Sequence, residues 1–209
     1  MTDLIAHLIL IAFGFLMGSI PFCYILPKKF LHKDICELSD DKNPGTANVF
    51  TVCGISMGFI CLFLELGKGI LPIILAKRSI ETSSFVFGAV MAAPVLGHAI
   101  GIFRNFHGGK CIAVSFGVLL GILPFYFPVL TLAAIYIFFS TVIKINPNRK
   151  RSIVTFVLFG FITSIILAYK HEYAIAFGCM VIAATATIKH LRHFMPVEST
   201  ENVDTVEQG

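Results

Sequence analysis

The chain has 209 residues, of which 56% are hydrophobic and 13% are charged, and its formal net charge is +4. Soluble domains carry about 25% charged residues, so this composition excludes an ordinary soluble globular protein and indicates an integral membrane protein. The six cysteines form no C-x-x-C pair, which argues against a zinc or redox centre because such centres commonly use that spacing. We therefore expect no metal, no other cofactor and no nucleic acid partner.

Long apolar segments divide the chain into candidate membrane spans. A transmembrane helix needs about 20 mostly apolar residues, and the predicted fold is all-α and polytopic with about seven transmembrane helices. The predicted spans are 4–26, 49–76, 84–103, 111–123, 125–143, 152–168 and 173–188. Pro124 and Pro128 mark either a turn between two spans or a kink in one, so six helices is the alternative. The first span lacks a basic start and a cleavage site, which favours a retained helix over a signal peptide.

The basic residues predict an orientation in the membrane. In the seven-helix arrangement, twelve of the 16 Lys and Arg residues fall on one side and three on the other, while Lys68 lies inside a span. The more positive side is expected to face the cytoplasm, which places the N-terminus outside and the C-terminus inside. We expect a single transmembrane domain over residues 1–195 and a polar, disordered tail over residues 196–209.

Two polar interruptions fall within or beside apolar segments. The sequence "GSIPF", residues 18–22, places Ser19 next to a glycine, which permits close helix packing, and Pro21 bends or ends the helix. In "LELGKGI", Glu65 and Lys68 are three residues apart and so share one helix face. Charged groups at membrane depth are costly and tend to pair and mark function, so a structural ion pair and a functional one are both open.

A third interruption is "KNPGTANVF", residues 42–50. Pro44 and Gly45 form a turn, and Thr46 or Asn48 can cap the helix that follows. A glycine-bearing turn that feeds a helix N-terminus also provides backbone N–H groups for an anion. An ordinary capped turn and an anion site are both consistent with this segment.

A fourth interruption is "FHGGKC", residues 106–111, which follows His98. His98 is either a structural hydrogen-bond donor or a base. Gly108, Gly109 and Lys110 form a turn at the start of the next helix, where backbone N–H groups and an ammonium group suit a phosphate. This turn, the turn at residues 43–48 and the segment "GSIPF" lie on one predicted side of the membrane. Their shared side favours an anion site facing the cytoplasm.

These elements in this order resemble the bacterial acyl-phosphate-dependent glycerol-3-phosphate acyltransferases, the PlsY family. The matching text is "GSIPF", "NPGTANVF", "ELGKGILP" and "LGHAIGIFRNFHGGKCIAVSFG", within about residues 14–123. The resemblance implies a multi-helix enzyme of the bacterial inner membrane, and we expect a monomer. It implies transfer of a fatty acyl group from acyl phosphate to the sn-1 hydroxyl of glycerol 3-phosphate, giving lysophosphatidic acid for phospholipid synthesis.

The resemblance also implies roles for individual residues. Lys110 and His98 are the expected catalytic residues, with Lys110 contacting a substrate phosphate. The expected substrate-binding residues are Ser19, Lys42, Asn43, Gly45, Thr46, Asn48, Lys68, His107, Gly108 and Gly109. No covalent enzyme nucleophile is expected, because acyl phosphate is already an activated anhydride and catalysis can rest on positioning and charge stabilisation.

The sequence departs from the family pattern at several positions. Asp41 and Lys42 stand where the family usually has Ser-Gly, Thr51 stands where an arginine is usual, and His107 replaces a lysine. Two other functions therefore stay open. One is a divergent paralogue that binds lipid phosphate without catalysis. The other is a transporter for a small anion, although no internal repeat is evident.

Overall fold

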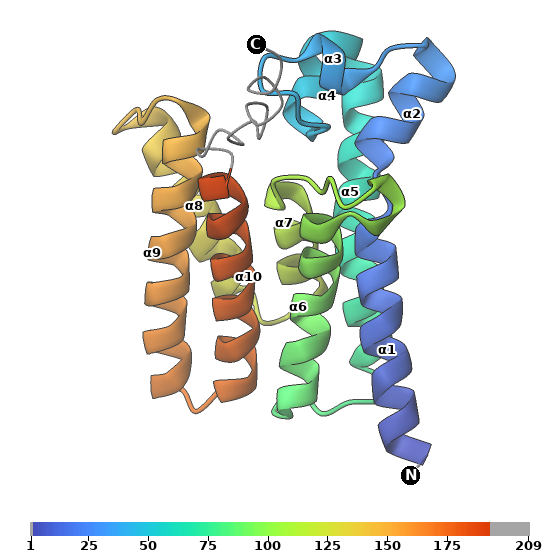
Figure 1. Ribbon diagram of the computed structural model, residues 1–209. Helices are drawn as coiled ribbons and strands as arrows, with labels where there is room; N and C mark the ends of the chain where they lie inside the picture. Colours follow the sequence, from blue (N-terminus) through green and yellow to red (C-terminus); the bar gives the residue numbers. More distant parts are fainter. Residues whose placement is uncertain (1, 193–209) are drawn as a thin grey trace, which may run out of the picture.

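The polar breaks between the apolar segments set the helix boundaries. The computed structural model describes residues 2–192, which form ten α-helices and one 3-10 helix and, within that range, no strand (Figure 1). The helices are α1 (Thr2–Ser19), α2 (Phe22–Leu31), α3 (Ile35–Leu38), α4 (Thr46–Cys53), α5 (Ile55–Ala76), α6 (Phe85–Ile100), η1 (Ile102–Arg104), α7 (Ile112–Gly121), α8 (Phe127–Thr141), α9 (Asn148–Tyr169) and α10 (Tyr173–Arg192). The predicted all-α fold is confirmed. The predicted tail, residues 196–209, lies outside the described residues.

The number of full membrane spans differs from the prediction. Among the described residues, α5, α6 together with η1, α9 and α10 are long and apolar enough to cross a membrane, and α1 with α2 makes a fifth span if the bent pair is counted as one. Helices α7 and α8 have 10 and 15 residues, so at about 1.5 Å per residue neither reaches the roughly 30 Å of a hydrocarbon core. Their connecting turn lies short of the lower end that α6 and α9 reach (Figure 1). All seven predicted segments are helical, but seven full spans are not confirmed.

Two predicted spans are interrupted. The chain bends by 43° between α1 and α2, because Pro21 lacks the N–H group that would continue the helix. The prediction of one helix over 49–76 is wrong, since Gly54 has a φ of +84° and separates α4 from α5. This conformation favours glycine. Helix α4 consequently packs back against α5, and the loop that precedes α4 lies near the upper part of the bundle (Figure 1).

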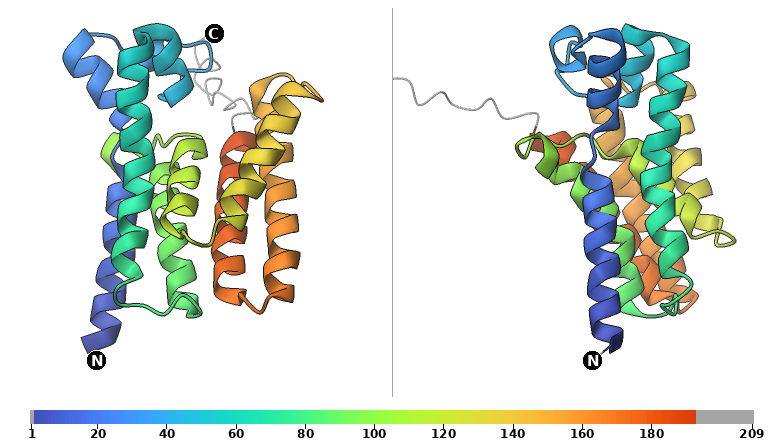
Figure 2. Two further views of the ribbon diagram at one scale, coloured as in Figure 1. Left: turned by 180° about the vertical axis from the view of Figure 1, so that it is seen from behind. Right: turned by 90° about the vertical axis from the view of Figure 1, so that its right-hand side faces the viewer.

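Helix α6 joins the two halves of the bundle, since it packs against α1 on one side and α10 on the other. The backbones of α1 and α6 approach closely: a Cβ atom on Gly18 would lie 2.0 Å from the Pro94 carbonyl oxygen, and one on Gly97 would lie 2.0 Å from that of Phe15. Figure 2 shows α8, α9 and α10 as one group, with α1, α5, α6 and α7 as the other. A cavity is lined by residues from both groups.

Candidate active site

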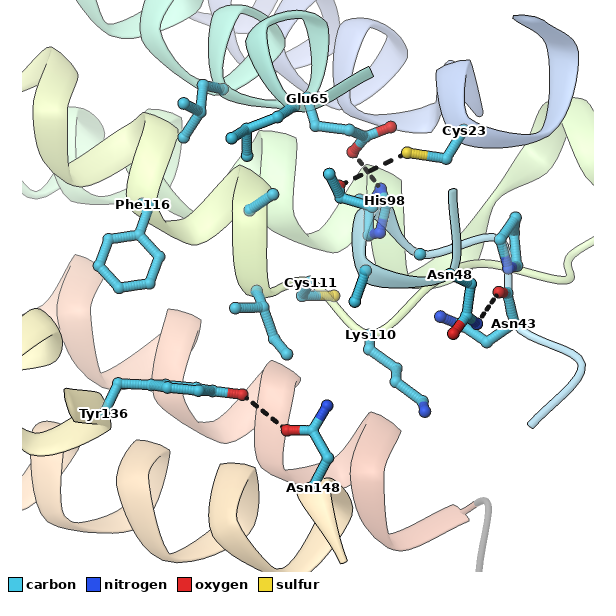
Figure 3. Close-up of a pocket in the computed structure, with 18 of the residues that line it drawn as sticks. Cys23, Asn43, Asn48, Glu65, His98, Lys110, Cys111, Phe116, Tyr136 and Asn148 are labelled. Atoms are coloured by element: carbon cyan, nitrogen blue, oxygen red, sulfur yellow. Dashed lines mark hydrogen bonds and ion pairs between the residues drawn. The ribbon is translucent and has the colours of Figure 1, made fainter. Parts of the chain in front are cut away.

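A cavity of about 630 Å³ lies between α5, α7, α8, the start of α9 and the loop before α4. Its polar lining residues include Asp41, Asn43, Thr46, Asn48, Glu65, His98, Lys110, Tyr136, Asn148 and Arg151. Its apolar lining residues include Leu62, Leu66, Phe116, Leu120 and Ile137. Phe116 and Tyr136 lie on the opposite side of the cavity from Asn43 and Asn48 (Figure 3). The cavity lining thus combines polar side chains with an apolar stretch, which suits an amphipathic ligand.

The loop before α4 is held together by its own side chains. Asn48 Nδ2 donates to the Asn43 carbonyl oxygen at 2.7 Å (Figure 3), and the Gly45 N–H donates to the same oxygen at 2.8 Å. The N-cap of α4 is Gly45, without a side-chain cap, so the expected capping by Thr46 or Asn48 is wrong. Asn48 instead turns back to the loop. Thr46 and Ala47 in the first turn of α4 line the cavity, and the first N–H groups of a helix have no partner within it.

The loop before α7, residues 105–111, is the second loop of the site, and it meets the loop before α4 through an ion pair. Lys110 Nζ contacts Asp41 Oδ2, although the two residues are 69 positions apart in the sequence. Asp41 Oδ1 accepts hydrogen bonds from Asn48 Nδ2 at 2.7 Å and from the Asn43 N–H at 3.2 Å. Partial burial by itself raises the pKa of Asp41, but hydrogen bonds from Lys110 and Asn48 outweigh it and hold this pKa below its ordinary value of 3.8. The Asp41 carboxylate is therefore charged at neutral pH and bridges the two loops.

A second group of charges is buried beneath the cavity. Lys68 Nζ donates to Glu65 Oε2, to His98 Nδ1 and to the Ile20 carbonyl oxygen, each at 2.8 Å. These three bonds use all the donors of the ammonium group. Nδ1 of His98 also lies 3.3 Å from Glu65 Oε2 (Figure 3), so both charged side chains contact this nitrogen. Nε2 lies against Gly109, where a Cβ atom would come within 2.4 Å of it. Glu65 and Lys68 thus fix the position of the His98 ring at the cavity wall.

Several residues expected at the site lie outside the cavity lining. Ser19 is buried between α1 and α6, where its Oγ donates to the carbonyl oxygens of Phe15 at 2.9 Å and Gly97 at 3.1 Å. Lys68 supports His98 from below. Lys42 is exposed, and its backbone has a φ of +48°.

The glycine turn is also placed behind the cavity rather than in its lining. The Gly109 N–H donates to the His98 carbonyl oxygen at 3.0 Å, and a Cβ atom on Gly108 would lie 2.3 Å from that same oxygen. His107 is exposed, with Nδ1 at 2.7 Å from the Asn105 carbonyl oxygen. The glycines therefore let the second loop pack onto the end of α6, and this contact directs Lys110 toward the cavity. Of the twelve expected site residues, those that line the cavity are Asn43, Gly45, Thr46, Asn48, His98 and Lys110.

The sequence analysis missed a polar wall contributed by α8 and α9. Tyr136 donates to Asn148 Oδ1 at 3.1 Å (Figure 3) and lies 2.8 Å from Ser152 Oγ. Arg151 donates to Asn148 Oδ1 at 2.8 Å, and its guanidinium lies 5.6 Å from the centre of the Tyr136 ring. The available signal was the basic run at the start of α9. It supported the predicted orientation but did not reveal that these residues face Lys110 across the cavity.

Comparison with known proteins decides the family. A family model described as glycerol-3-phosphate acyltransferase matches residues 8–196. The chain belongs to this family. It is 30% identical over 202 residues to the glycerol-3-phosphate acyltransferases of Streptococcus pyogenes serotype M5 (strain Manfredo) and serotype M1, with 94% of this chain and 92% of each relative covered. The predicted family and enzyme class are confirmed: this is a membrane acyltransferase.

Two solved structures of this acyltransferase family share the fold. Both are crystal structures of PlsY, described as an integral membrane glycerol 3-phosphate acyltransferase. The lysophosphatidic acid form is 26% identical with a TM-score of 0.73, and the glycerol 3-phosphate form is 25% identical with a TM-score of 0.75. In each case the match covers 90% of both chains. The family fold is therefore retained over 90% of the chain.

Proposed function

We propose that this acyltransferase moves a fatty acyl group from acyl phosphate to the sn-1 hydroxyl of glycerol 3-phosphate. The bond between the acyl carbon and a phosphate oxygen breaks, and an ester bond to the glycerol oxygen forms. The hydroxyl proton passes to the leaving phosphate, so the products are lysophosphatidic acid and inorganic phosphate. The observation that carries this proposal is the convergence of Lys110 with the Asn43–Asn48 loop beside an apolar cavity in a chain of this family.

The polar side of the cavity supports binding of phosphate. Lys110 supplies a cation, Asn48 Nδ2 supplies an amide donor, and the first turn of α4 supplies backbone N–H groups beside them. Charge-assisted hydrogen bonds to phosphate oxygens are among the stronger polar contacts in proteins. Arg151 lines the facing wall and adds a second positive charge. These groups are suited to hold two phosphate-bearing substrates close together, which is the main requirement of this reaction.

The apolar side of the cavity supports binding of the acyl chain. Leu62 and Leu66 on α5, Phe116 on α7 and Ile137 on α8 line this side. Burial of each methylene group contributes about 0.8 kcal/mol. An acyl chain along these residues would leave its carboxyl end near the polar side, where the phosphate groups are held. The chain would extend toward the lipid between α5, α7 and α8.

His98 is suited to stabilise the transition state. Its Nδ1 is held by Lys68 and Glu65, and a proton on Nε2 would serve as a hydrogen-bond donor to the oxygen of the attacked carbonyl. A fixed donor at a developing oxyanion is worth about 3–4 kcal/mol in enzymes studied by mutation. In this assignment His98 acts as a donor, while the phosphate leaving group takes the proton. Lys68 and Glu65 are positioning residues because they act through His98.

The arrangement in the bacterial inner membrane is part of the same proposal. The N-terminus and the last described turn of α10 lie at opposite ends of the bundle (Figure 1). The basic residues near the cavity support a cytoplasmic active site, with the N-terminus outside. The protein is proposed to act as a monomeric, single-domain enzyme, over residues 1–195, without a cofactor.

The deciding experiment is a turnover assay. Purified protein is given acyl phosphate and glycerol 3-phosphate, and lysophosphatidic acid and inorganic phosphate are measured together. Equal amounts of both products support the proposal. Saturable binding of phosphate compounds without products would favour the non-catalytic paralogue. Counterflow of a labelled anion in vesicles without acyl transfer would favour the transporter.

A further inference from the structure

The donors expected to grip a substrate phosphate are already occupied by the protein itself. One oxygen of the Asp41 carboxylate contacts Lys110 Nζ. The other oxygen accepts from Asn48 Nδ2 at 2.7 Å and from the Asn43 N–H at 3.2 Å. A cation, an amide and a backbone N–H around one small anion form a set of contacts typical of a phosphate site. Asp41 thus occupies the position that a phosphate oxygen would take.

We propose that Asp41 is an internal competing anion, which holds Lys110, Asn48 and the Asn43 N–H until a substrate phosphate displaces it. The proposal rests on the proposed function, because it assigns the displacing group to a substrate of that reaction. It makes Asp41 a determinant of the apparent affinity for phosphate-bearing substrates.

The different exposure of the two partners supports displacement. The Lys110 side chain is 14% exposed, whereas the Asp41 side chain is 42% exposed. Asp41 can therefore turn into water and remain hydrated, while Lys110 stays at the cavity. A phosphate group brings a charge of roughly −1.5 to −2 and three acceptor oxygens, so it can replace every contact that the carboxylate makes. The apparent dissociation constant then equals the intrinsic one divided by the fraction of molecules in which Asp41 has left the site.

The first test is the Asp41→Asn variant in the acyl-transfer assay. The variant keeps the size of the side chain but removes the competing charge. We expect the KM for the competing phosphate substrate to fall about three- to tenfold, the scale of one partly exposed ion pair. The control is Asp40→Asn, which removes the same charge from an exposed neighbour that is not part of the cavity lining. Its KM should stay within about twofold of the wild type on the same scale.

The KM values for the two substrates identify which substrate's phosphate competes with Asp41. A lower KM for glycerol 3-phosphate assigns the site to the acceptor, and a lower KM for acyl phosphate assigns it to the donor. An unchanged or higher KM for both substrates would overturn the proposal, since Asp41 would then position Lys110 and not compete for it.

A binding measurement separates this inference from the proposed function. Inorganic phosphate is titrated into the wild type and Asp41→Asn, and the shift of the thermal unfolding midpoint is recorded in detergent. Protection of Asp41→Asn at a lower phosphate concentration supports internal competition, even if the wild type shows no acyl transfer. Equal phosphate dependence of the two proteins would overturn it. Asp41→Ser, which also removes the charge, replaces Asp41→Asn if that variant does not fold.

Discussion

The protein contains two lysine–carboxylate pairs near its cavity, and their surroundings give them different capabilities. Lys68 and Glu65 are 2.8 Å apart with side chains that are 0% and 2% exposed, whereas the side chains of Lys110 and Asp41 are 14% and 42% exposed. Neither member of the buried Lys68–Glu65 pair can exchange its partner for water. Lys68 also holds His98 through a hydrogen bond. The Lys110–Asp41 pair lies at the cavity rim, where Lys110 can exchange the Asp41 carboxylate for another anion. Burial therefore separates a supporting role from a binding role in otherwise similar ion pairs.

The largest effect is expected from breaking the buried pair. Lys68→Met leaves the Glu65 carboxylate buried without its cation, which costs about 3–5 kcal/mol. Unfolding midpoints in detergent and the yield of monodisperse protein should both drop sharply. The double variant Lys68→Met with Glu65→Gln removes the unpaired charge and should recover part of this loss. A single variant as stable as the wild type would contradict the supporting role.

The pair at the cavity rim should respond in the opposite way, with loss of activity but little loss of stability. Lys110→Ala is expected to lower turnover of acyl phosphate about tenfold or more, the scale of losing one charge-stabilising contact. Its unfolding midpoint should stay close to that of the wild type. Lys29→Ala is the control, because Lys29 is an exposed cation on α2 that does not line the cavity. If both variants retained near wild-type turnover, Lys110 would not belong to the active site.

A smaller effect is expected at Ser19, which supports the helix packing as the buried pair does and does not line the cavity. Ser19→Ala removes the hydrogen bond from α1 to the Gly97 carbonyl oxygen on α6, which is worth about 1 kcal/mol. The unfolding midpoint should fall slightly while the KM for glycerol 3-phosphate stays unchanged. A raised KM with unaltered stability would instead show that Ser19 contacts substrate, as the family resemblance implied.

The smallest effect is expected from titration of Asp41. Its pKa in the folded protein lies below the ordinary value of 3.8, so its carboxylate binds fewer protons when folded than when unfolded. The stability that it contributes is fully present above pH 3.8 and is lost as the pH falls through the lower, folded-state pKa. The difference in unfolding midpoint between the wild type and Asp41→Asn should therefore be constant from pH 7 to about 5 and change only below the ordinary carboxyl pKa. A difference that changes near pH 6 would point to another group.

Local sequence patterns gave reliable information about some features of the site and poor information about others. The turns at Asn43–Asn48 and at Lys110 were predicted to share one face, because each is short, polar and placed between apolar segments. Their direct contact through Asp41 was not predicted. The break at Gly54 was missed because the apolar run continues on both sides of it, and hydropathy does not register a positive φ. Tyr136 and Arg151 were missed as site residues because their neighbours in sequence show no motif.

The sequence by itself determined the membrane class, the all-helical fold and the family, since hydropathy, glycine turns and short motifs are properties of residues close together in the chain. Only the tertiary structure decided which charges are buried, which helices are too short to span the membrane, and which partner holds each lysine. Those features depend on helix packing that brings residues such as Asp41 and Lys110 together from 69 positions apart. The same packing buries the Lys68 ammonium away from water and leaves the Asp41 carboxylate accessible to water.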